Sequence, residues 1–382
     1  MKKSLIFWLF VASIVFLLNK LCQGSLNLLV FETSDSMYAI YKLMIYIVLV
    51  AFVFLYQNPI DSYEKKTITR KAVIFSAICI ISSILNLSAN SLNDFFVIIL
   101  NLISLPIALS AGYKLSRLKD DKTKDVLLLV LQIPAFVSAY TILSQPFGVK
   151  PDVAFSVAVF MPFSFCMSKR WRTYLLLIFY IFIYFLAAKR AILGVAIACT
   201  SILFIYDIFF SKAKVLSWQM FFTLMTIIGG ILYLANQSDA ITHTIDRFAT
   251  LEDNIGNGRD EIYTYIFSSE SNASVTQLML GNGYFSVLKD FGKHAHNDFL
   301  EIMYDFGIFA LIAYVVFLCQ IVKVMRHRFL NTQTRHNTIY LFLVLLTFLI
   351  LGFSNSILCS NFLELSLSLS LGYMLAVAEE KT

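Results

Sequence analysis

The sequence predicts an all-α protein, a polytopic membrane helix bundle of about twelve transmembrane helices with one large periplasmic loop. Three observations support this fold class. Of the 382 residues, 59% are hydrophobic and only 14% are charged, whereas soluble domains are roughly half apolar and a quarter charged. Long apolar runs follow one another along the chain, and Lys and Arg are unevenly distributed between them. The hydrocarbon of a bilayer accommodates such an apolar excess better than one water-soluble core does.

The apolar runs define the expected helices, because a helix that crosses the hydrocarbon needs roughly 20 mostly apolar residues. The runs are 4–22, 37–57, 72–89, 92–113, 126–145, 152–168, 173–188, 190–210, 216–236, 298–322, 338–357 and 361–378. The run 152–168 is short and contains Pro162, so we expect a kink there. The runs 173–188 and 190–210 form either a tight hairpin or one broken segment. No small-residue cleavage site follows the first run, which indicates an uncleaved helix rather than a signal peptide.

The distribution of Lys and Arg predicts how the chain is oriented. The basic clusters lie in every second connection, within residues 65–71, 114–124, 169–172, 212–214 and 323–335. Cytoplasmic loops carry this excess. We therefore expect a protein of the bacterial inner membrane with both termini in the cytoplasm. Residues 1–236 then form membrane helices one to nine, residues 237–297 form the periplasmic loop, and residues 298–382 form helices ten to twelve. The net charge of +6 reflects orientation, since no basic stripe typical of a nucleic-acid binder is present.

The predicted loop is the only long polar stretch of the sequence. Loops of more than about 15 residues are usually functional or disordered. This loop contains enough aromatic and aliphatic residues to fold back on the membrane domain, and residues 259–267 read as a short helix after Gly256-Asn257-Gly258. It contains no cysteine, and none of the six cysteines of the chain stands in a CxxC pair, so neither a disulfide in the loop nor a zinc or redox motif is indicated.

The densest polar segment is 293–301, which reads Lys-His-Ala-His-Asn-Asp-Phe-Leu-Glu. Histidine is the side chain best suited to proton transfer near neutral pH. His294 and His296 alternate, so on an extended chain they would point in opposite directions. Asp298 and Glu301 have the spacing of a capping box that starts the next helix, which competes with a catalytic role for these acids. A His-x-His pair also binds metals, although no third ligand is evident.

Cations are rare on the predicted outer side, where Lys189, Arg190, Arg247 and Arg259 are expected. Lys189 and Arg190 either extend to the headgroups or face a polar cavity, and Arg247 and Arg259 could pair with the neighbouring Asp246 and Asp260. Arginine also binds phosphate through paired N–H donors. The turn 281–284, Gly-Asn-Gly-Tyr, is either a plain turn or one whose N–H groups approach a phosphate. One histidine and two or three arginines would suffice for glycosyl transfer from a lipid pyrophosphate, without metal or nucleotide.

These residues stand in patterns that resemble the O-antigen polymerase and O-antigen ligase family. The resembling features are Arg259 after Gly258, Leu280-Gly281-Asn282-Gly283-Tyr284, His296-Asn297 followed by Gly307, and Ala188-Lys189-Arg190-Ala191, which is similar to a Ser-Arg-Gly-Ala step of the family. The resemblance covers the topology and, in detail, residues from about 186 to 310. The sequence departs from the family pattern at Ala191, where glycine is frequent, and at Ala310.

The resemblance implies an inverting, metal-independent glycosyltransferase without a cofactor that uses undecaprenyl-pyrophosphate-linked oligosaccharides. His296 matches the base of the family, and Arg190 and Arg259 match the arginines that hold the donor pyrophosphate. The further residues expected to bind substrate are Lys189, Arg247, His294, Asn297, Gly281, Gly283 and Tyr284. Expected partners besides the donor are membrane lipid and a chain-length regulator and flippase of the same pathway, and no nucleic acid.

Polymerase and ligase use the same kind of donor and differ in the acceptor, which is a second lipid-linked repeat unit or lipid A-core. We favour the polymerase because the 36 Phe and 19 Tyr of this chain fit the aromatic-rich character of polymerases. A lipid-linked-sugar flippase is a third hypothesis, disfavoured because polar residues gather at one face and no internal repeat is visible. A scaffold or sensor would tolerate replacement of the loop arginines and His296.

Overall fold

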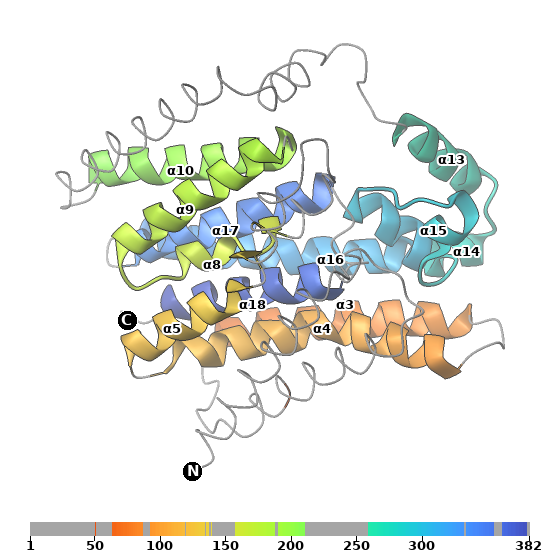
Figure 1. Ribbon diagram of the computed structural model, residues 1–382. Helices are drawn as coiled ribbons and strands as arrows, with labels where there is room; N and C mark the ends of the chain where they lie inside the picture. Colours follow the sequence, from red (N-terminus) through yellow and green to blue (C-terminus); the bar gives the residue numbers. More distant parts are fainter. Residues whose placement is uncertain are drawn as a thin grey trace, which may run out of the picture. The chain divides into compact units, whose positions relative to one another are not determined.

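The computed structural model describes residues 63–86, 92–118, 120–133, 157–187, 190–210, 259–331, 334–354 and 361–379, together with positions 50, 135, 136 and 139. Within these ranges all regular secondary structure is α-helical (Figure 1). The expected helices 4–22 and 216–236 lie outside the described residues, as do 37–57 apart from position 50, Lys189, Arg247 and the first part of the loop. The chain divides into two compact units, which contain, among the described residues, 63–118 with 259–379 and 120–210 respectively.

In its described residues the first unit contains five long helices and three short ones. The long helices are α3 (Tyr63–Leu85), α4 (Leu92–Ser116), α16 (Asp298–Leu330), α17 (Arg335–Ser354) and α18 (Asn361–Val377). Helix α3 packs on α4 and α16, α17 packs on α16 and α18, and α18 packs along α4. The short helices α13 (Arg259–Ser271), α14 (Val275–Leu280) and α15 (Ser286–Phe291) lie at the end where α16 begins (Figure 1).

Two glycines bring α4 and α18 into close contact. A Cβ atom on Gly112 would lie 1.9 Å from the carbonyl oxygen of Leu369, and a Cβ atom on Gly372 would lie 2.1 Å from that of Leu109. Small residues let membrane helices approach backbone to backbone, which gains packing where the hydrophobic effect offers little. These two positions therefore exclude any side chain.

Five helical segments in the described ranges are long and apolar enough to cross a membrane. They are Glu64–Leu85, Ile98–Ser116, Ile192–Phe210, Asp298–Leu330 and Arg335–Ser354. On α3 and α16 large apolar side chains such as Ile81, Leu85, Phe309 and Ile312 are exposed, as expected of helices that face lipid. The all-α fold is confirmed for the described residues, and these five helices agree with a membrane protein, while the expected number of about twelve spans and the side on which the loop lies stay predictions.

Several helix boundaries differ from the sequence prediction. Helix α3 begins at Tyr63 rather than at residue 72, because a charged first turn suits a helix even where it does not suit the hydrocarbon. In the run 152–168 the described part, 157–168, is helical at 157–158 and, after a turn, again in the four-residue helix α8 (Pro162–Phe165), so the kink expected at Pro162 is a break just before that residue. Pro162 occupies the first turn of α8, where its missing N–H costs nothing, and it cannot continue a preceding helix.

The second unit contains α5 (Asp121–Leu131), α8, α9 (Arg170–Leu186) and α10 (Arg190–Phe210). Helices α9 and α10 are separate and pack on each other, which confirms the hairpin rather than a single broken segment. Buried Asp125 of α5 accepts hydrogen bonds from the Ser168 backbone (2.8 Å) and side chain (2.5 Å) and pairs with Arg172. These contacts hold α5 to the start of α9.

Candidate functional site

The described part of the predicted loop is folded and packs on α16. Ile262 and Ile266 of α13 form a buried cluster with Val287 of α15, with Ala295 in the connection that follows, and with Tyr304 of α16. Helix α13 begins at Arg259, as the sequence predicted, and extends to Ser271. The prediction that this segment folds back on the membrane helices is therefore confirmed for residues 259–297.

The loop docks into a break in α16. Helix α16 is interrupted at Gly307, whose φ of 80° and ψ of 179° are not helical. The carbonyl oxygens of Tyr304 and Asp305, just before the break, accept hydrogen bonds from the backbone N–H groups of Asn282 (3.0 Å) and Gly283 (2.7 Å). A Cβ atom on Gly281 would lie 2.3 Å from the Asp305 carbonyl oxygen. The loop backbone therefore touches the helix backbone at a position where only glycine fits.

The same turn is also bound by α3 and α4. The Ser82 hydroxyl donates to the carbonyl oxygen of Leu280, the Asn86 side chain donates to that of Gly281 (3.3 Å), and the Asn101 side chain donates to the Tyr284 hydroxyl. The N–H groups of 281, 282 and 283 all donate to protein carbonyls. These contacts give the turn a structural role, and the phosphate-binding role suggested for Gly281, Gly283 and Tyr284 stays a prediction.

Three buried carboxylates follow one face of α16, at Asp298, Glu301 and Asp305. The Asp305 carboxylate accepts the backbone N–H groups of Phe285 and Val287, both at 3.0 Å, and so fixes the start of α15. Acidic side chains inside a helix that is apolar enough to cross a membrane are costly, and they are usually paired or functional. The stripe therefore marks this face of α16 as the polar side of the site.

The capping-box interpretation of Asp298 and Glu301 was wrong. The N-cap of α16 is Asn297, whose side-chain oxygen accepts from the N–H groups of Phe299 (3.0 Å) and Leu300 (3.4 Å). Because Asn297 already supplies the cap, both acids fall inside the helix and turn towards the protein. The Asp298 carboxylate lies against Gly352 of α17, where a Cβ atom would come within 2.7 Å of it.

Glu301 is paired with His294. The His294 Nδ1 atom lies 2.5 Å from the Glu301 carboxylate, and the imidazole ring meets the Phe285 ring edge to face at 5.6 Å. His296 has a φ of 53°, in the left-handed region that few residues other than glycine adopt. The segment is therefore not extended at His296, and the two histidines do not alternate in the way that the sequence suggested.

Arg259 reaches the end of α17. Its guanidinium donates to the carbonyl oxygen of Ser354 at 3.0 Å, at a helix C-terminus, where carbonyl groups need donors. Beside it, Phe353 stacks on Phe299 of α16 with the ring centroids 4.7 Å apart. The structure thus places the Arg259 guanidinium at the end of α17, whose Phe353 packs on Phe299 in the first turn of α16.

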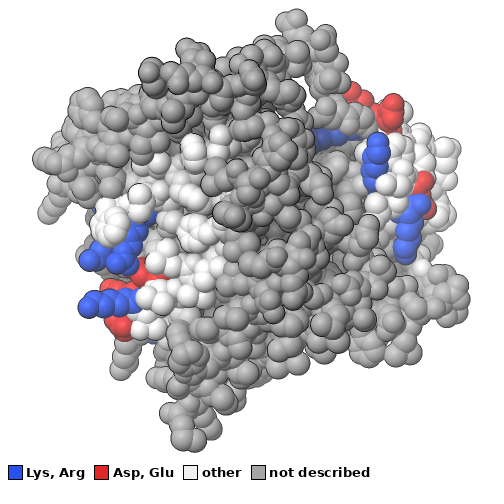
Figure 2. Space-filling model, viewed as in Figure 1, with Lys and Arg blue, Asp and Glu red and all other residues white. Residues whose placement is uncertain are grey.

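The remaining predicted cations are not placed at this site. Arg190 begins α10 in the second unit, and its side chain lies outside the description, as do Lys189 and Arg247. Charged side chains of both signs lie over α13 to α15 (Figure 2). Among them, burial raises the pKa of half-buried Glu270 above its ordinary value. The surface of these short helices thus carries charges of both signs (Figure 2) beside exposed apolar side chains such as Phe267 and Val275.

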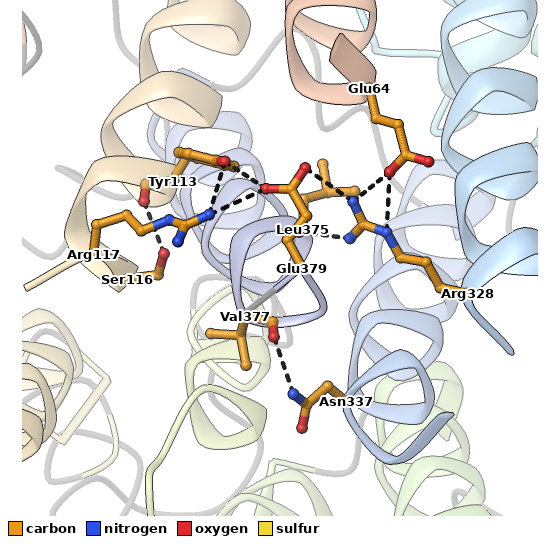
Figure 3. A network of polar contacts seen from close by, with 9 residues as sticks. All are labelled: Glu64, Tyr113, Ser116, Arg117, Arg328, Asn337, Leu375, Val377 and Glu379. Atoms are coloured by element: carbon orange, nitrogen blue, oxygen red, sulfur yellow. Dashed lines mark hydrogen bonds and ion pairs between the residues drawn. The ribbon is translucent and has the colours of Figure 1, made fainter. Parts of the chain in front are cut away.

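A second polar network lies at the other end of the first unit, and sequence reasoning missed it (Figure 3). Arg328 of α16, with a side chain only 7% exposed, pairs with Glu64 at 2.6 Å and with Glu379 at 3.1 Å. Glu379 also accepts from Tyr113 and pairs with Arg117 at 3.4 Å. Three of the basic clusters that the sequence assigned to one side, those within 65–71, 114–124 and 323–335, thus meet at one end, where Glu64 and Glu379 join them.

No family model matches the sequence, and a search of the curated proteins finds no match either. In the part of the chain that the structure describes, no group of three or more His, Cys, Asp or Glu side chains is placed to hold a metal ion. The functional argument therefore rests on the sequence patterns and on the contacts around α16.

Proposed function

We propose that this protein is a surface polysaccharide polymerase for O-antigen or capsule, which joins undecaprenyl-pyrophosphate-linked repeat units at the periplasmic face of a bacterial inner membrane. The observation that carries the proposal is the folded polar loop, which brings Arg259 and the segment with His294 and His296 to one end of apolar helices. A lipid-linked sugar diphosphate requires this combination of a cation, a base and an adjacent membrane.

The proposed reaction is an inverting transfer that needs no metal ion. An imidazole of the loop accepts the proton of the acceptor hydroxyl, whose oxygen attacks the anomeric carbon of the donor sugar. The bond from that carbon to the pyrophosphate breaks, and the pyrophosphate lipid leaves with the electron pair. Arg259 stabilises the growing negative charge, together with Arg190 as the family resemblance implies, and the resemblance assigns the base to His296.

The charge distribution supports the orientation. The end of the first unit that carries Lys65, Arg117 and Arg328 is the more basic one, and basic ends of membrane helices usually face the cytoplasm. Helices α13 to α15 then face the periplasm, where lipid-linked repeat units are presented after flipping. We also propose that both termini lie in the cytoplasm, as the distribution of Lys and Arg in the sequence predicts.

A ligase that transfers the glycan to lipid A-core remains the second candidate, since His296-Asn297 and Gly307 stand at the spacing of the ligase pattern. The two enzymes would use the same residues and the same leaving group, so the acceptor alone separates them.

Deleting the gene in the source bacterium and separating its surface glycans on a gel tests the proposal. A polymerase predicts loss of long chains with a single repeat unit left on the acceptor, and a ligase predicts bare acceptor. A flippase predicts that repeat units accumulate on the lipid at the inner leaflet. Complementation with Arg259→Ala should fail, whereas the exposed Arg326 at the opposite end of α16 gives a matched control, Arg326→Ala, that should restore the ladder. An unchanged ladder in the deletion strain would refute the proposed function.

A further inference from the structure

We infer that His294, oriented by the carboxylate of Glu301, is the group that accepts the proton in the transfer reaction. This inference rests on the proposed function and names its base. It differs from the assignment by resemblance, which points to His296, two residues further along the chain.

The contact between the two side chains has the geometry of a base and its orienting acid. The Nδ1 atom of His294 lies 2.5 Å from the Glu301 carboxylate. An ionised carboxylate can only accept, so the proton of a neutral imidazole is held on Nδ1 and the lone pair is left on Nε2. This is the tautomer that a general base needs, and a buried carboxylate fixes it in the same way in other hydrolytic and transfer enzymes.

Exposure divides the roles between the two residues. The Glu301 side chain is 2% exposed and the His294 side chain is 23% exposed. The acid is therefore shielded from water and from substrate, whereas the imidazole has an accessible edge. Glu301 accordingly acts through His294 as a positioning residue, and His294 is the one that meets the acceptor hydroxyl.

Packing holds the imidazole in one place. Its ring meets Phe285 edge to face, and the following residue, Ala295, is fully buried in the cluster that binds the loop to α16. Asn297 then caps α16, so the chain is fixed within three residues on the C-terminal side of the histidine. A general base must be preorganised in this way, because small displacements of the reacting atoms cost rate.

His296 has a different feature. Its φ of 53° makes it the turn that carries the chain into Asn297 and α16. The left-handed conformation at this residue changes the direction of the backbone, which is a structural role. Replacing its side chain should therefore affect the reaction less than replacing that of His294.

In the step assigned to His294, Nε2 takes the hydroxyl proton of the acceptor sugar as its oxygen bonds to the anomeric carbon of the donor. The carbon–oxygen bond to the pyrophosphate breaks, and the pyrophosphate lipid keeps the electron pair. His294 becomes an imidazolium next to the Glu301 carboxylate, which stabilises it until the proton passes to water. No oxidant, reductant or further reactant is required.

The test uses membranes that contain the full-length protein, with lipid-linked repeat units extracted from the deletion strain as substrate. His294→Asn keeps a donor to Glu301 near the position of Nδ1 but has no basic nitrogen. It should lower kcat by about a hundredfold or more at an unchanged protein level. Glu301→Gln would donate to Nδ1 and favour the tautomer that carries its proton on Nε2, so kcat should fall while KM stays close to that of the wild type. His296→Ala should retain activity within about tenfold.

His294→Ala leaves space beside Glu301, so added imidazole should restore part of its activity and should restore none in Glu301→Gln. If His294→Asn keeps the wild-type rate, the pair is only a structural contact and the inference is wrong. If His296→Ala is inactive and His294→Ala is active, the base is His296. If wild-type membranes do not lengthen the lipid-linked glycan, the proposed function itself fails. The wild-type sample alone shows this, so it is not confused with a failure of the His294 assignment.

Discussion

Replacing Gly281 by alanine should detach the loop from α16. A control variant at Gly292 separates the penalty of the backbone conformation from that of the steric collision. Gly281 has a φ of 73° and no room for a Cβ atom, which would lie 2.3 Å from the Asp305 carbonyl oxygen. Gly292, at the end of α15, has a φ of 78° and no atom within 4 Å of such a Cβ. Gly292→Ala therefore measures the penalty of a left-handed backbone alone, since Gly292 has a ψ of 2°. Gly281→Ala adds the collision, at a ψ of −169° that is essentially restricted to glycine.

The expected magnitudes follow from these contacts. The left-handed conformation costs alanine about 1–2 kcal/mol at Gly292, and the backbone conformation of Gly281 costs alanine about 1–3 kcal/mol. At Gly281 the overlap adds about 1–3 kcal/mol. The backbone shift that relieves the overlap weakens the hydrogen bonds from Asn282 to Tyr304 and from Gly283 to Asp305, which contribute about 1 kcal/mol each. The two variants should thus differ by about 2–5 kcal/mol in the free energy of docking the loop.

Hydrogen exchange of the amides of Asn282 and Gly283, followed by mass spectrometry of the protein in lipid nanodiscs, measures this difference. Each 1.4 kcal/mol corresponds to about a tenfold change in the opening equilibrium, so exchange in Gly281→Ala should exceed that in Gly292→Ala by at least about thirtyfold. Equal exchange in the two variants would show that Gly281 does not touch α16, and the description of the docked loop would be wrong.

Two further predictions concern the membrane helices. Gly372→Ala would place a Cβ atom 2.1 Å from the carbonyl oxygen of Leu109, so it should destabilise the protein by about 1–3 kcal/mol or more in a thermal unfolding assay in detergent. In the same assay the control Gly194→Ala, which has open space around the new Cβ atom, should be neutral or slightly stabilising. Arg328→Ala removes the partner of Glu64 and Glu379 and should lower the free energy of unfolding by about 3–5 kcal/mol. The control Arg326→Ala, at an exposed position, should leave the melting temperature unchanged. Equal melting temperatures of the two variants would argue against the network in Figure 3.

The sequence predicted what local patterns encode. Apolar length located the long helices, and the Gly-Asn-Gly sequence at 256–258 predicted the start of α13 at Arg259. The alternation of basic clusters correctly grouped Lys65, Arg117 and Arg328 at one end, because this pattern depends only on which loops share a side.

The contacts that build the site depend on tertiary structure and were not predictable in this way. Gly281 and Gly307 are both visible in the sequence, but no spacing rule pairs a turn with a helix break that lies elsewhere in the chain. Glu301 matched a capping box because three-residue spacing is the same whether an acid caps a helix or lies inside it. The choice was decided by Asn297, a strong N-cap that shifts the start of α16 and leaves Glu301 to pair with His294.

The most direct test of the proposed reaction is to reconstitute the purified protein in liposomes with fluorescent undecaprenyl-pyrophosphate-linked repeat units and to measure release of undecaprenyl pyrophosphate together with glycan length. The proposal predicts one pyrophosphate lipid released for each bond formed, longer glycans over time, and loss of both in Arg259→Ala but not in Arg326→Ala. Donor and glycan that stay unchanged with folded wild-type protein, in either membrane orientation, would contradict the proposal.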